Sequence, residues 1–376
     1  MKIIINQRKK LKNLRKKMNK YNIDSFNITP ARVSFVQHRS ECNVYNFDNK
    51  LPLFTAPMNS VVNDENFEVF NENKINTIIP RGVDFTIRVK MCNNTFVAMS
   101  LQEFSDFIDI LQKKELADND IFYICVDVAN GHMAKLIDMC SAAKQMFNHH
   151  VVIMTGNIAN PETYVQYAIA GIDFVRCGIG GSGVCLTSKK TGVHYPMGSL
   201  IKEIADKKWT IERCIADSKQ LNINCEYKSV PFIVADGGID SIDRIIKALS
   251  LGADYVMCGR IFAQSEEACG ESYWQYPKDL TTLSEHDKQR LVYHEPVCEY
   301  GFHLREYYGM STHRAQKETG RKTLAAEEGI ETYVDIKYTL ADWCYEFISA
   351  LQSAMSYTNS LNLEEFKNCT HTIITR

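Results

Sequence analysis

The sequence lacks the features that mark several large classes of protein. It has no apolar run of about 18 residues or more, so we expect no membrane-spanning helix and no membrane partner. The N-terminus has no apolar core of a secretion signal. The 43 Lys and Arg residues nearly balance the 45 Asp and Glu residues, for a formal net charge of −2, so no global basic field predicts binding to DNA.

The cysteines show no pairing pattern. There are 13 of them, an odd number, and no two are spaced as Cys-x-x-Cys. Several, including Cys125, Cys177 and Cys258, stand inside apolar runs. Reduced thiols explain this usage better than a disulfide framework does, so we expect a cytoplasmic protein.

Only the N-terminus departs from the balance of charge. Residues 1–20 carry nine positive charges and no negative ones. One interpretation is an arm that touches RNA, an anionic membrane surface or a partner protein. The other is a solvated, partly helical extension, which we favour because runs of like charge are commonly solvated tails. We therefore treat residues 1–20 as a basic N-terminal extension.

From about residue 50 onward, short apolar segments alternate with helical patterns. Such segments are typical of parallel strands that are buried on both faces. Repeated strand–helix units indicate an α/β protein, and a strand count that approaches eight favours a (β/α)8 TIM barrel over an open doubly wound sheet. The polar residues 203–230 predict an enlarged surface excursion between two strands. The strand candidates are 51–58, 75–80, 122–128, 151–155, 172–177, 232–235 and 255–258, and the helix candidates are 64–73, 102–114, 132–147, 161–170, 197–219 and 240–250.

The most informative stretch is residues 178–187, which read GIGGSGVCLT. It follows a predicted strand, and α/β barrels place their chemistry at the carboxyl ends of strands. Glycines let the backbone approach a ligand closely, and Cys185 beyond them offers a thiolate nucleophile. Thr187 offers a hydroxyl that can deliver a proton. The structural alternatives are a buried thiol and a simple turn hydroxyl.

Two later strand ends carry groups suited to a phosphorylated ligand. Asp236 ends a strand and offers a carboxylate to a ribose diol, while the amides of Gly237 and Gly238 can meet a phosphate. One strand later, Gly259 and Arg260 add backbone donors and a positive charge, where barrels commonly build a phosphate site. The structural alternatives are a tight turn at Asp236 and a surface or subunit contact at Arg260.

Three further positions are candidates for catalysis or binding. The loop Tyr308-Gly309-Met310-Ser311 can present hydroxyls and backbone groups to a heterocycle. Glu328 is a candidate acid or base, although a glutamate in a charged segment is more often exposed to solvent. Asp127 ends another predicted strand, where it either binds a cofactor or caps the following helix.

In this order, the five segments resemble the IMP dehydrogenase/GMP reductase family. The family pattern at the cysteine loop is Gly-Ile-Gly-Pro-Gly-Ser-x-Cys-x-Thr, of which this chain keeps the outer glycines, the cysteine and the threonine. The resemblance covers about residues 21–376. It implies a single barrel catalytic domain over that range, with an active-site flap near 300–330. The family usually forms a homotetramer that binds GMP or IMP beside a nicotinamide cofactor.

The resemblance also implies roles for individual residues. Cys185 would attack C2 of the purine, and Thr187 and Glu328 would move a proton. Asp236 would hold the ribose hydroxyls. The implied binding residues are Gly183, Gly237, Gly238, Gly259, Arg260 and Tyr308 on the phosphate side, Gly309, Met310 and Ser311 at the base, Arg39, Asp127, Val128, Ala129, Gly180 and Met310 at the cofactor, and the carbonyls of Gly180, Ser182 and Cys185 around a potassium ion.

The resemblance leaves the branch of the family open. The dehydrogenase uses an Arg-Tyr pair on a mobile flap, and residues 311–328 contain none; residues 81–121 leave no room for its regulatory tandem domain. Residues 127–131, 189–193 and 308–311 look like the reductase, but residues 231–239 and 328–331 look as much like the dehydrogenase. We favour an NADPH-dependent GMP reductase. The alternatives are an NAD-dependent IMP dehydrogenase and, because of the basic arm and the altered loop, a non-catalytic barrel that binds purine nucleotides or RNA.

The chain departs from the family pattern at several positions. Residues 181–183 read Gly-Ser-Gly instead of Pro-Gly-Ser, and Arg260 can offset the shifted hydroxyl by pairing with phosphate. Asn59 replaces an aspartate. Ala325 replaces an arginine that precedes the catalytic glutamate, and His194 replaces a glycine. These departures indicate a divergent enzyme whose substrate preference is open.

Overall fold

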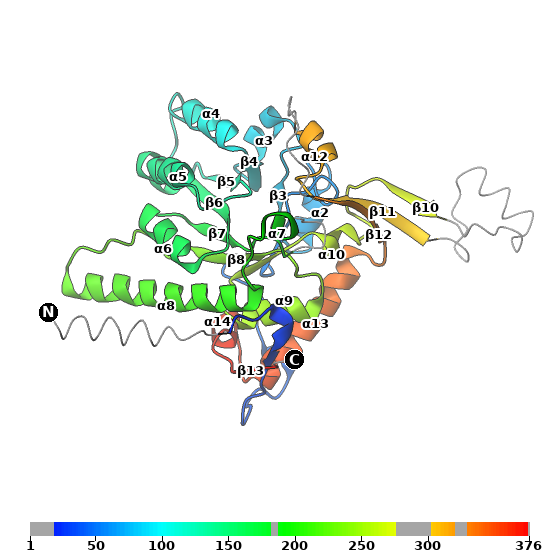
Figure 1. Ribbon diagram of the computed structural model, residues 1–376. Coiled ribbons are helices and arrows are strands. Elements are labelled where there is room, and N and C mark those ends of the chain that lie inside the picture. Colours follow the sequence, from blue (N-terminus) through cyan, green and yellow to red (C-terminus); the bar gives the residue numbers. More distant parts are fainter. Residues whose placement is uncertain (1–18, 182–186, 276–301, 320–328, 375–376) are drawn as a thin grey trace, which may run out of the picture.

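The structure is a computed structural model that describes residues 19–181, 187–275, 302–319 and 329–374. Its centre is an eight-stranded sheet in the order β2-β9-β8-β7-β6-β5-β4-β3, in which all neighbouring strands are parallel (Figure 1). The strands are β2 (Leu53–Thr55), β3 (Ile78–Ile79), β4 (Phe96–Met99), β5 (Phe122–Asp127), β6 (Val151–Ile158), β7 (Phe174–Cys177), β8 (Phe232–Asp236) and β9 (Tyr255–Cys258).

The two edge strands of this sheet meet. Phe54 in β2 forms a parallel bridge with Asn76, just before β3. The Thr55 amide donates to the Asn76 carbonyl at 2.9 Å, and the Asn76 amide donates to the Leu53 carbonyl at 3.1 Å. The sheet therefore curls into a nearly closed barrel, and the predicted α/β (β/α)8 TIM barrel is confirmed.

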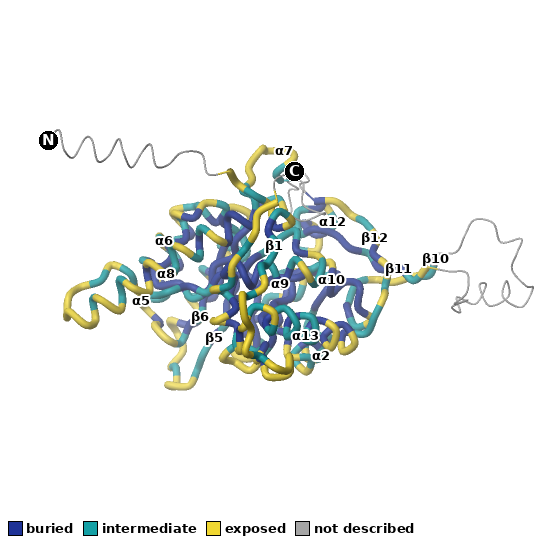
Figure 2. The backbone as a smooth tube through the Cα atoms, turned by 90° about the horizontal axis from the view of Figure 1, so that it is seen from below, coloured by how far each residue is buried: buried dark blue, intermediate teal, exposed yellow. Residues whose placement is uncertain are grey.

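Helices follow the strands and cover the outside of the barrel, so that buried positions concentrate in its centre (Figure 2). Local sequence explains where several of them begin. Asn160 caps α6 by accepting from the Glu162 amide at 3.0 Å, and Pro161 occupies the first turn. Ser100 and Glu103 form a capping box at the start of α4. The outer helices are α2 (Phe67–Glu72), α3 (Phe85–Met91), α4 (Leu101–Leu111), α5 (Ala134–Phe147), α6 (Pro161–Ala170), α8 (Met197–Leu221), α9 (Ile242–Ser250) and α13 (Leu340–Tyr357).

Aromatic side chains fill the inside of the barrel. Phe54 lies 5.0 Å from Tyr255 and 5.9 Å from Phe174, measured between ring centroids. Phe174 in turn lies 5.0 Å from Phe232 and 5.4 Å from Phe96. The barrel is thus a packed core and not a pore, and ligands must bind at one end of it.

A second, three-stranded antiparallel sheet projects from the barrel (Figure 1). It consists of β10 (Ser272–Gln275), β11 (Phe302–Tyr308) and β12 (Glu331–Asp335), and the helix α12 (His313–Glu318) lies between β11 and β12 in the chain. Near the termini, β1 (Phe26–Ile28) pairs with β13 (His371–Ile373). The remaining short elements are η1 (Ile23–Ser25), η2 (Arg39–Glu41), η3 (Asn148–His150), α7 (Thr187–Thr191), α10 (Arg260–Ala263) and α14 (Leu363–Phe366).

Several elements were absent from the sequence prediction, among them the helices α3 and α13 and the three strands of the second sheet. The strand β4 was not among the predicted strands, because its four apolar residues are too few to show a period. The helix predicted over 197–219 is confirmed by the 25-residue helix α8, so that, of the residues 203–230 expected to form a surface excursion, only residues 222–230 lie in a loop. Within the described ranges, no helix is long and apolar enough to cross a membrane. The division at residue 20 stays a prediction, because residues 1–18 lie outside the description.

Candidate active site

The predicted site residues lie at the carboxyl ends of neighbouring barrel strands. Asp127 is the last residue of β5 and Asp236 the last of β8. Gly178 directly follows β7, and Gly259 directly follows β9. Because β5 to β9 are consecutive in the sheet, these strand ends form one arc of the barrel mouth.

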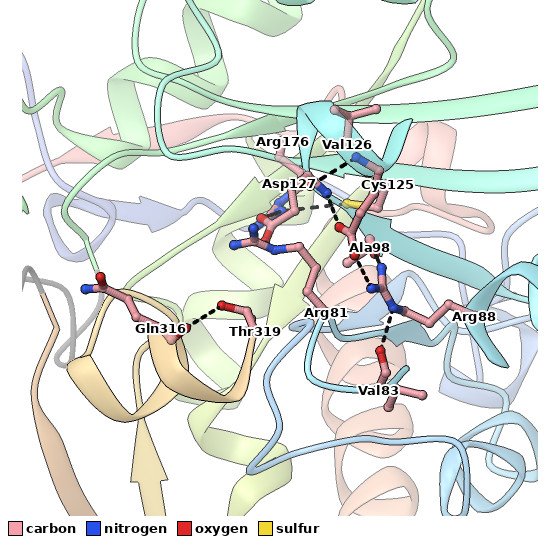
Figure 3. A network of polar contacts seen from close by, with 12 residues as sticks. Arg81, Val83, Arg88, Ala98, Cys125, Val126, Asp127, Arg176, Gln316 and Thr319 are labelled. Atoms are coloured by element: carbon pink, nitrogen blue, oxygen red, sulfur yellow. Dashed lines mark hydrogen bonds and ion pairs between the residues drawn. The ribbon is translucent and has the colours of Figure 1, made fainter. Parts of the chain in front are cut away.

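Arg176, which the sequence analysis did not single out, joins the two carboxylates. It lies in β7, and its guanidinium donates to Asp127 Oδ1 at 2.7 Å and to Asp236 Oδ2 at 2.8 and 3.2 Å. Arg81 Nε lies 3.3 Å from the other oxygen of Asp127. Figure 3 shows both guanidinium groups pointing toward Asp127. Two cations and two carboxylates therefore alternate across the mouth.

Asp127 and Arg176 stay ionised despite their burial. Burial by itself acts to raise the pKa of Asp127, but Arg176 and Arg81 outweigh it, so the pKa lies below its usual value. Burial likewise acts to lower the pKa of Arg176, and Asp236 and Asp127 reverse that effect. Asp127 and Arg176 are thus fixed charges at neutral pH and not proton donors or acceptors.

The Asp236 carboxylate has one occupied side. Its Oδ2 accepts from Arg176 and from Asn157 Nδ2, the latter at 2.7 Å. Asn157 also donates to the Gly178 carbonyl at 2.9 Å, which ties Asp236 to the start of the glycine-rich loop. Among the described residues, the donors to Asp236 all bind Oδ2. The arrangement therefore presents Oδ1 to a ligand that carries hydroxyl groups.

The glycine-rich loop and the turn after Asp236 pack backbone against backbone. A Cβ added to Gly181 would lie 2.8 Å from the Gly237 carbonyl oxygen, and one added to Gly238 would overlap the Gly181 carbonyl. Gly238 also has φ +76°, which L side chains rarely adopt. Side chains here would push the two loops apart, so the sequence Gly-Gly at both places is what allows the contact.

Tyr307 and Tyr308, the last two residues of β11, point to opposite faces of that strand. A Cβ on Gly259 would lie 2.7 Å from the Tyr307 hydroxyl, so Tyr307 reaches the strand end of β9. The Tyr308 hydroxyl instead donates to Glu318 at 3.1 Å. Neighbouring residues of a strand point to opposite faces, so only one of the two can face the barrel. Tyr307 is thus the residue that lies at the end of β9, while the predicted role of Tyr308 at the phosphate stays a prediction.

The residues around the glycine-rich loop hold its two ends. The Gly180 carbonyl accepts from Ser188 Oγ at 3.0 Å, and the ring of His194 binds the Ile179 carbonyl at 3.0 Å. Thr187 begins α7 at this point. The predicted residues Ser182, Gly183, Cys185 and Glu328 lie outside the described residues.

Most of the other predicted residues lie at the same end of the barrel. The Val128 carbonyl accepts from the Asn157 amide at 3.1 Å, which brings the segment of Val128 and Ala129 beside β6. Arg260 begins α10, directly after β9. The loop Gly309–Ser311 follows β11, and Met310 packs against the core.

Arg39 is not brought to these residues. It lies in η2 on the outside of the barrel, where the neighbouring Cys42 carbonyl accepts from Gln352 Nε2 in the C-terminal half of α13 at 3.3 Å. A role at the cofactor therefore has no support from the contacts within one copy of the chain.

Comparison with known proteins gives one family. The family model described as IMP dehydrogenase / GMP reductase domain matches residues 93–282. A GMP reductase from Oceanobacillus iheyensis is 27% identical over 368 residues, which cover 95% of this chain and 96% of that protein. GMP reductase 2 from Mus musculus is 27% identical over 328 residues, or 85% of this chain and 82% of its own length. An inosine-5'-monophosphate dehydrogenase from Chlorobaculum parvum is 31% identical over 255 residues, or 68% of this chain and 45% of that protein.

Proposed function

The chain belongs to the IMP dehydrogenase/GMP reductase family, whose members are oxidoreductases acting on GMP or IMP, and we propose that it is a GMP reductase that uses NADPH. The observation that carries the proposal is the contact between the glycine-rich loop and the turn at Asp236, beside a carboxylate that Arg176 and Asn157 hold in place. Two relatives that align with most of their length are named GMP reductases, and this favours the reductase over the dehydrogenase.

The described residues fit a purine nucleotide monophosphate. Oδ1 of Asp236 suits the hydroxyls of a ribose, since its Oδ2 is already saturated. Gly237 and Gly238 have φ of +105° and +76°, so their backbone can approach a ligand without a Cβ in the way. Gly259 and Arg260 lie one strand further on and supply backbone donors and a positive charge for a phosphate.

The described residues also fit a nicotinamide cofactor. Asp127 ends β5 beside Arg81, whose Nε is buried without a hydrogen bond to the described residues. Its charge lies 3.3 Å from Asp127 and would hold that carboxylate in place, while Asp127, Val128, Ala129 and Met310 would line the side of the cofactor. Bound NADPH would supply the hydride that reduces C2 of the purine.

The proposed chemistry follows from the family resemblance. The Cys185 thiolate adds to C2 of GMP, while Thr187 and Glu328 move a proton to the 2-amino group. Ammonia then leaves, and the sulfur of Cys185 remains bonded to C2 in a covalent thioimidate. After C2 has received a hydride, the C–S bond breaks and IMP is released with the thiolate restored. In sum, GMP, NADPH and a proton give IMP, ammonia and NADP⁺.

The charge network of this chain would position the reactants and leave proton transfer to other groups. Arg176 holds Asp236 and Asp127 at fixed places, so the ribose and the cofactor would be held relative to one guanidinium. Fixed positions matter because C2 must meet both the sulfur and the hydride donor near contact distance.

A potassium ion, a homotetramer and a cytoplasmic location complete the proposed surroundings of the enzyme. Gly180 contributes a carbonyl whose second lone pair stays available to a potassium ion beside Ser188. A homotetramer would cover exposed apolar side chains such as Phe35, Val33 and Tyr357, of which Phe35 is 80% exposed. A cytoplasmic location agrees with the free thiols of all the cysteines in the described ranges.

Turnover with separate substrates tests the proposal. GMP, dGMP and IMP are each supplied with the reduced and the oxidised cofactor, and the reduced-nicotinamide absorbance is followed. We expect GMP to oxidise NADPH with release of ammonia, and dGMP to be used at least about tenfold less well, because it lacks one hydroxyl for Asp236. Reduction of NAD by IMP, without reaction of GMP, would assign the chain to the dehydrogenase branch. Nucleotide binding without any turnover would make it a non-catalytic barrel.

A further inference from the structure

A cluster of polar side chains joins α12 to the barrel. At its centre is the carboxylate of Glu318, the last residue of α12. It accepts from Asn59 Nδ2 at 2.5 Å, from the Tyr308 hydroxyl at 3.1 Å and from Arg314 Nε at 3.2 Å. Tyr308 and Arg314 belong to the same excursion of the chain as Glu318. Asn59, in the segment after β2, is the partner that comes from the barrel itself.

Asn59 is fixed from two other sides. Its carbonyl lies 3.0 Å from Cys269 Sγ. Gly82, in the segment between β3 and α3, packs so closely that an added Cβ would overlap the Asn59 amide group. Asn59 Oδ1 is buried and has no hydrogen-bond partner among the described residues. The contact that orients the amide is therefore the donation from Nδ2 to Glu318.

We propose that Asn59 is a positioning residue that docks α12 on the barrel through Glu318 and thereby fixes the loop Gly309–Ser311 at the mouth. The connection between helix and loop is short. Thr312 caps α12, and both its amide and its hydroxyl donate to the Gly309 carbonyl, at 3.0 and 2.9 Å. The helix and the loop therefore move as one unit, and a displacement of Glu318 is passed on to Gly309.

Whether the side chain at residue 59 is neutral or negatively charged decides whether its hydrogen bond to Glu318 forms. An amide donates a hydrogen bond to a carboxylate, whereas a carboxylate of the same shape would repel it. The other groups that face Glu318 keep their charge state near neutral pH. Burial, and then Glu318, raises the pKa of Tyr308, so that it stays a neutral donor. Arg314 stays charged between Glu318 and Glu306, and burial raises the pKa of the Cys269 thiol to about 12.

Hydrogen–deuterium exchange of the full-length protein tests the contact without reference to activity. We compare wild type, Asn59→Asp, Glu318→Gln and the double variant Asn59→Asp/Glu318→Gln, which exchanges the acid and the amide. In Asn59→Asp at neutral pH, the amides of α12 should exchange at least about threefold faster. In the double variant exchange should return to near the wild-type rate. Asn94→Asp, on an exposed turn at the opposite end of the barrel, is the matched control and should leave α12 unchanged.

Two results would overturn the proposal. One is an Asn59→Asp variant whose α12 amides exchange at the wild-type rate. The other is a double variant in which the two single changes increase the exchange rate of α12 additively and do not cancel. Exchange of α13, to which none of the hydrogen bonds given for this cluster runs, shows whether a variant is folded. If Asn59→Asp fails to fold, Glu318→Gln and the double variant still decide, because only the pairing predicts that the double variant protects α12.

Activity provides a second measurement, and this part rests on the proposed function. In Asn59→Asp, kcat/KM for GMP should fall as the pH rises through the neutral range, since the two carboxylates can share a proton only at lower pH. Wild type and the double variant should lack that fall. An enzyme that does not reduce GMP at all would refute the proposed function and leave the exchange result standing, so the two failures can be told apart.

Discussion

Replacing Arg176 with methionine tests the charge network at the barrel mouth. The side chain of Arg176 is only 8% exposed, and those of Asp127 and Asp236 are 13% and 15% exposed. The variant therefore leaves two buried carboxylates without their shared cation. Loss of one partner of a buried ion pair destabilises a protein by about 3–5 kcal/mol. Asp127 keeps Arg81 and Asp236 keeps Asn157, so we expect the lower end, about 3 kcal/mol at neutral pH.

The pH dependence of this effect has a definite sign. The folded pKa of Asp127 lies below its usual value, because Arg176 and Arg81 outweigh the effect of burial. Such a carboxyl contributes stability above its unfolded pKa of about 3.9 and loses that contribution as the pH falls through its folded pKa. The difference between wild type and Arg176→Met is thus full at neutral pH and shrinks as the pH falls below about 4, toward the lower folded pKa of Asp127.

Urea unfolding followed by circular dichroism, at neutral and acidic pH, measures this difference. The double variant Arg176→Met/Asp127→Asn serves as a rescue, because it removes one of the stranded charges and should recover part of the free energy of unfolding. A loss of less than about 1 kcal/mol at neutral pH, or a loss that does not shrink on acidification, would refute the network as described.

The remaining predictions concern the proposed reaction and the contact between the loops. Cys185→Ala should abolish the oxidation of NADPH by GMP without lowering the midpoint of urea unfolding; residual turnover would exclude the sulfur from the chemistry. Asp236→Asn should raise KM for GMP by about tenfold or more and narrow the preference for GMP over dGMP, which steady-state kinetics would show. Gly238→Ala should displace the loop at Gly181 and lower activity at least about tenfold, whereas Gly192→Ala, with a similar φ of +72° but nothing within 4 Å of the added Cβ, should cost only about 1 kcal/mol of stability. Equal activities of the two alanine variants would contradict the proposed contact.

The barrel and most of its strands were predictable because the signals are local. A short apolar run that ends in a glycine or an aspartate indicates a buried strand followed by a loop, and β5, β7, β8 and β9 all follow that pattern. The order of the strands then brings their carboxyl ends together. For this reason Asp127 and Asp236 could both be predicted to lie at the ends of strands, and the family resemblance implied their common site.

The interactions between these residues were not predictable. Arg176 lies in an apolar run, and its partners are 49 and 60 residues away in the chain, so nothing nearby marks it as the centre of a network. The choice between Tyr307 and Tyr308 depends on which face of β11 meets the barrel. That in turn depends on the pairing of β11 with β10 and β12, which no local pattern in the chain defines.

Arg176 couples the nucleotide side of the proposed site to its cofactor side. One guanidinium holds Asp236 on the side of the proposed nucleotide and Asp127 on the side of the proposed cofactor. Its geometry is planar and rigid, so neither carboxylate can shift without weakening the bond to the other. Lysine has a single ammonium group and could not keep both donor contacts with Asp236 Oδ2 together with the contact with Asp127. We therefore expect Arg176→Lys to impair the use of GMP and of NADPH together, a joint effect that separate binding residues would not produce and that initial-rate kinetics with both reactants varied would measure.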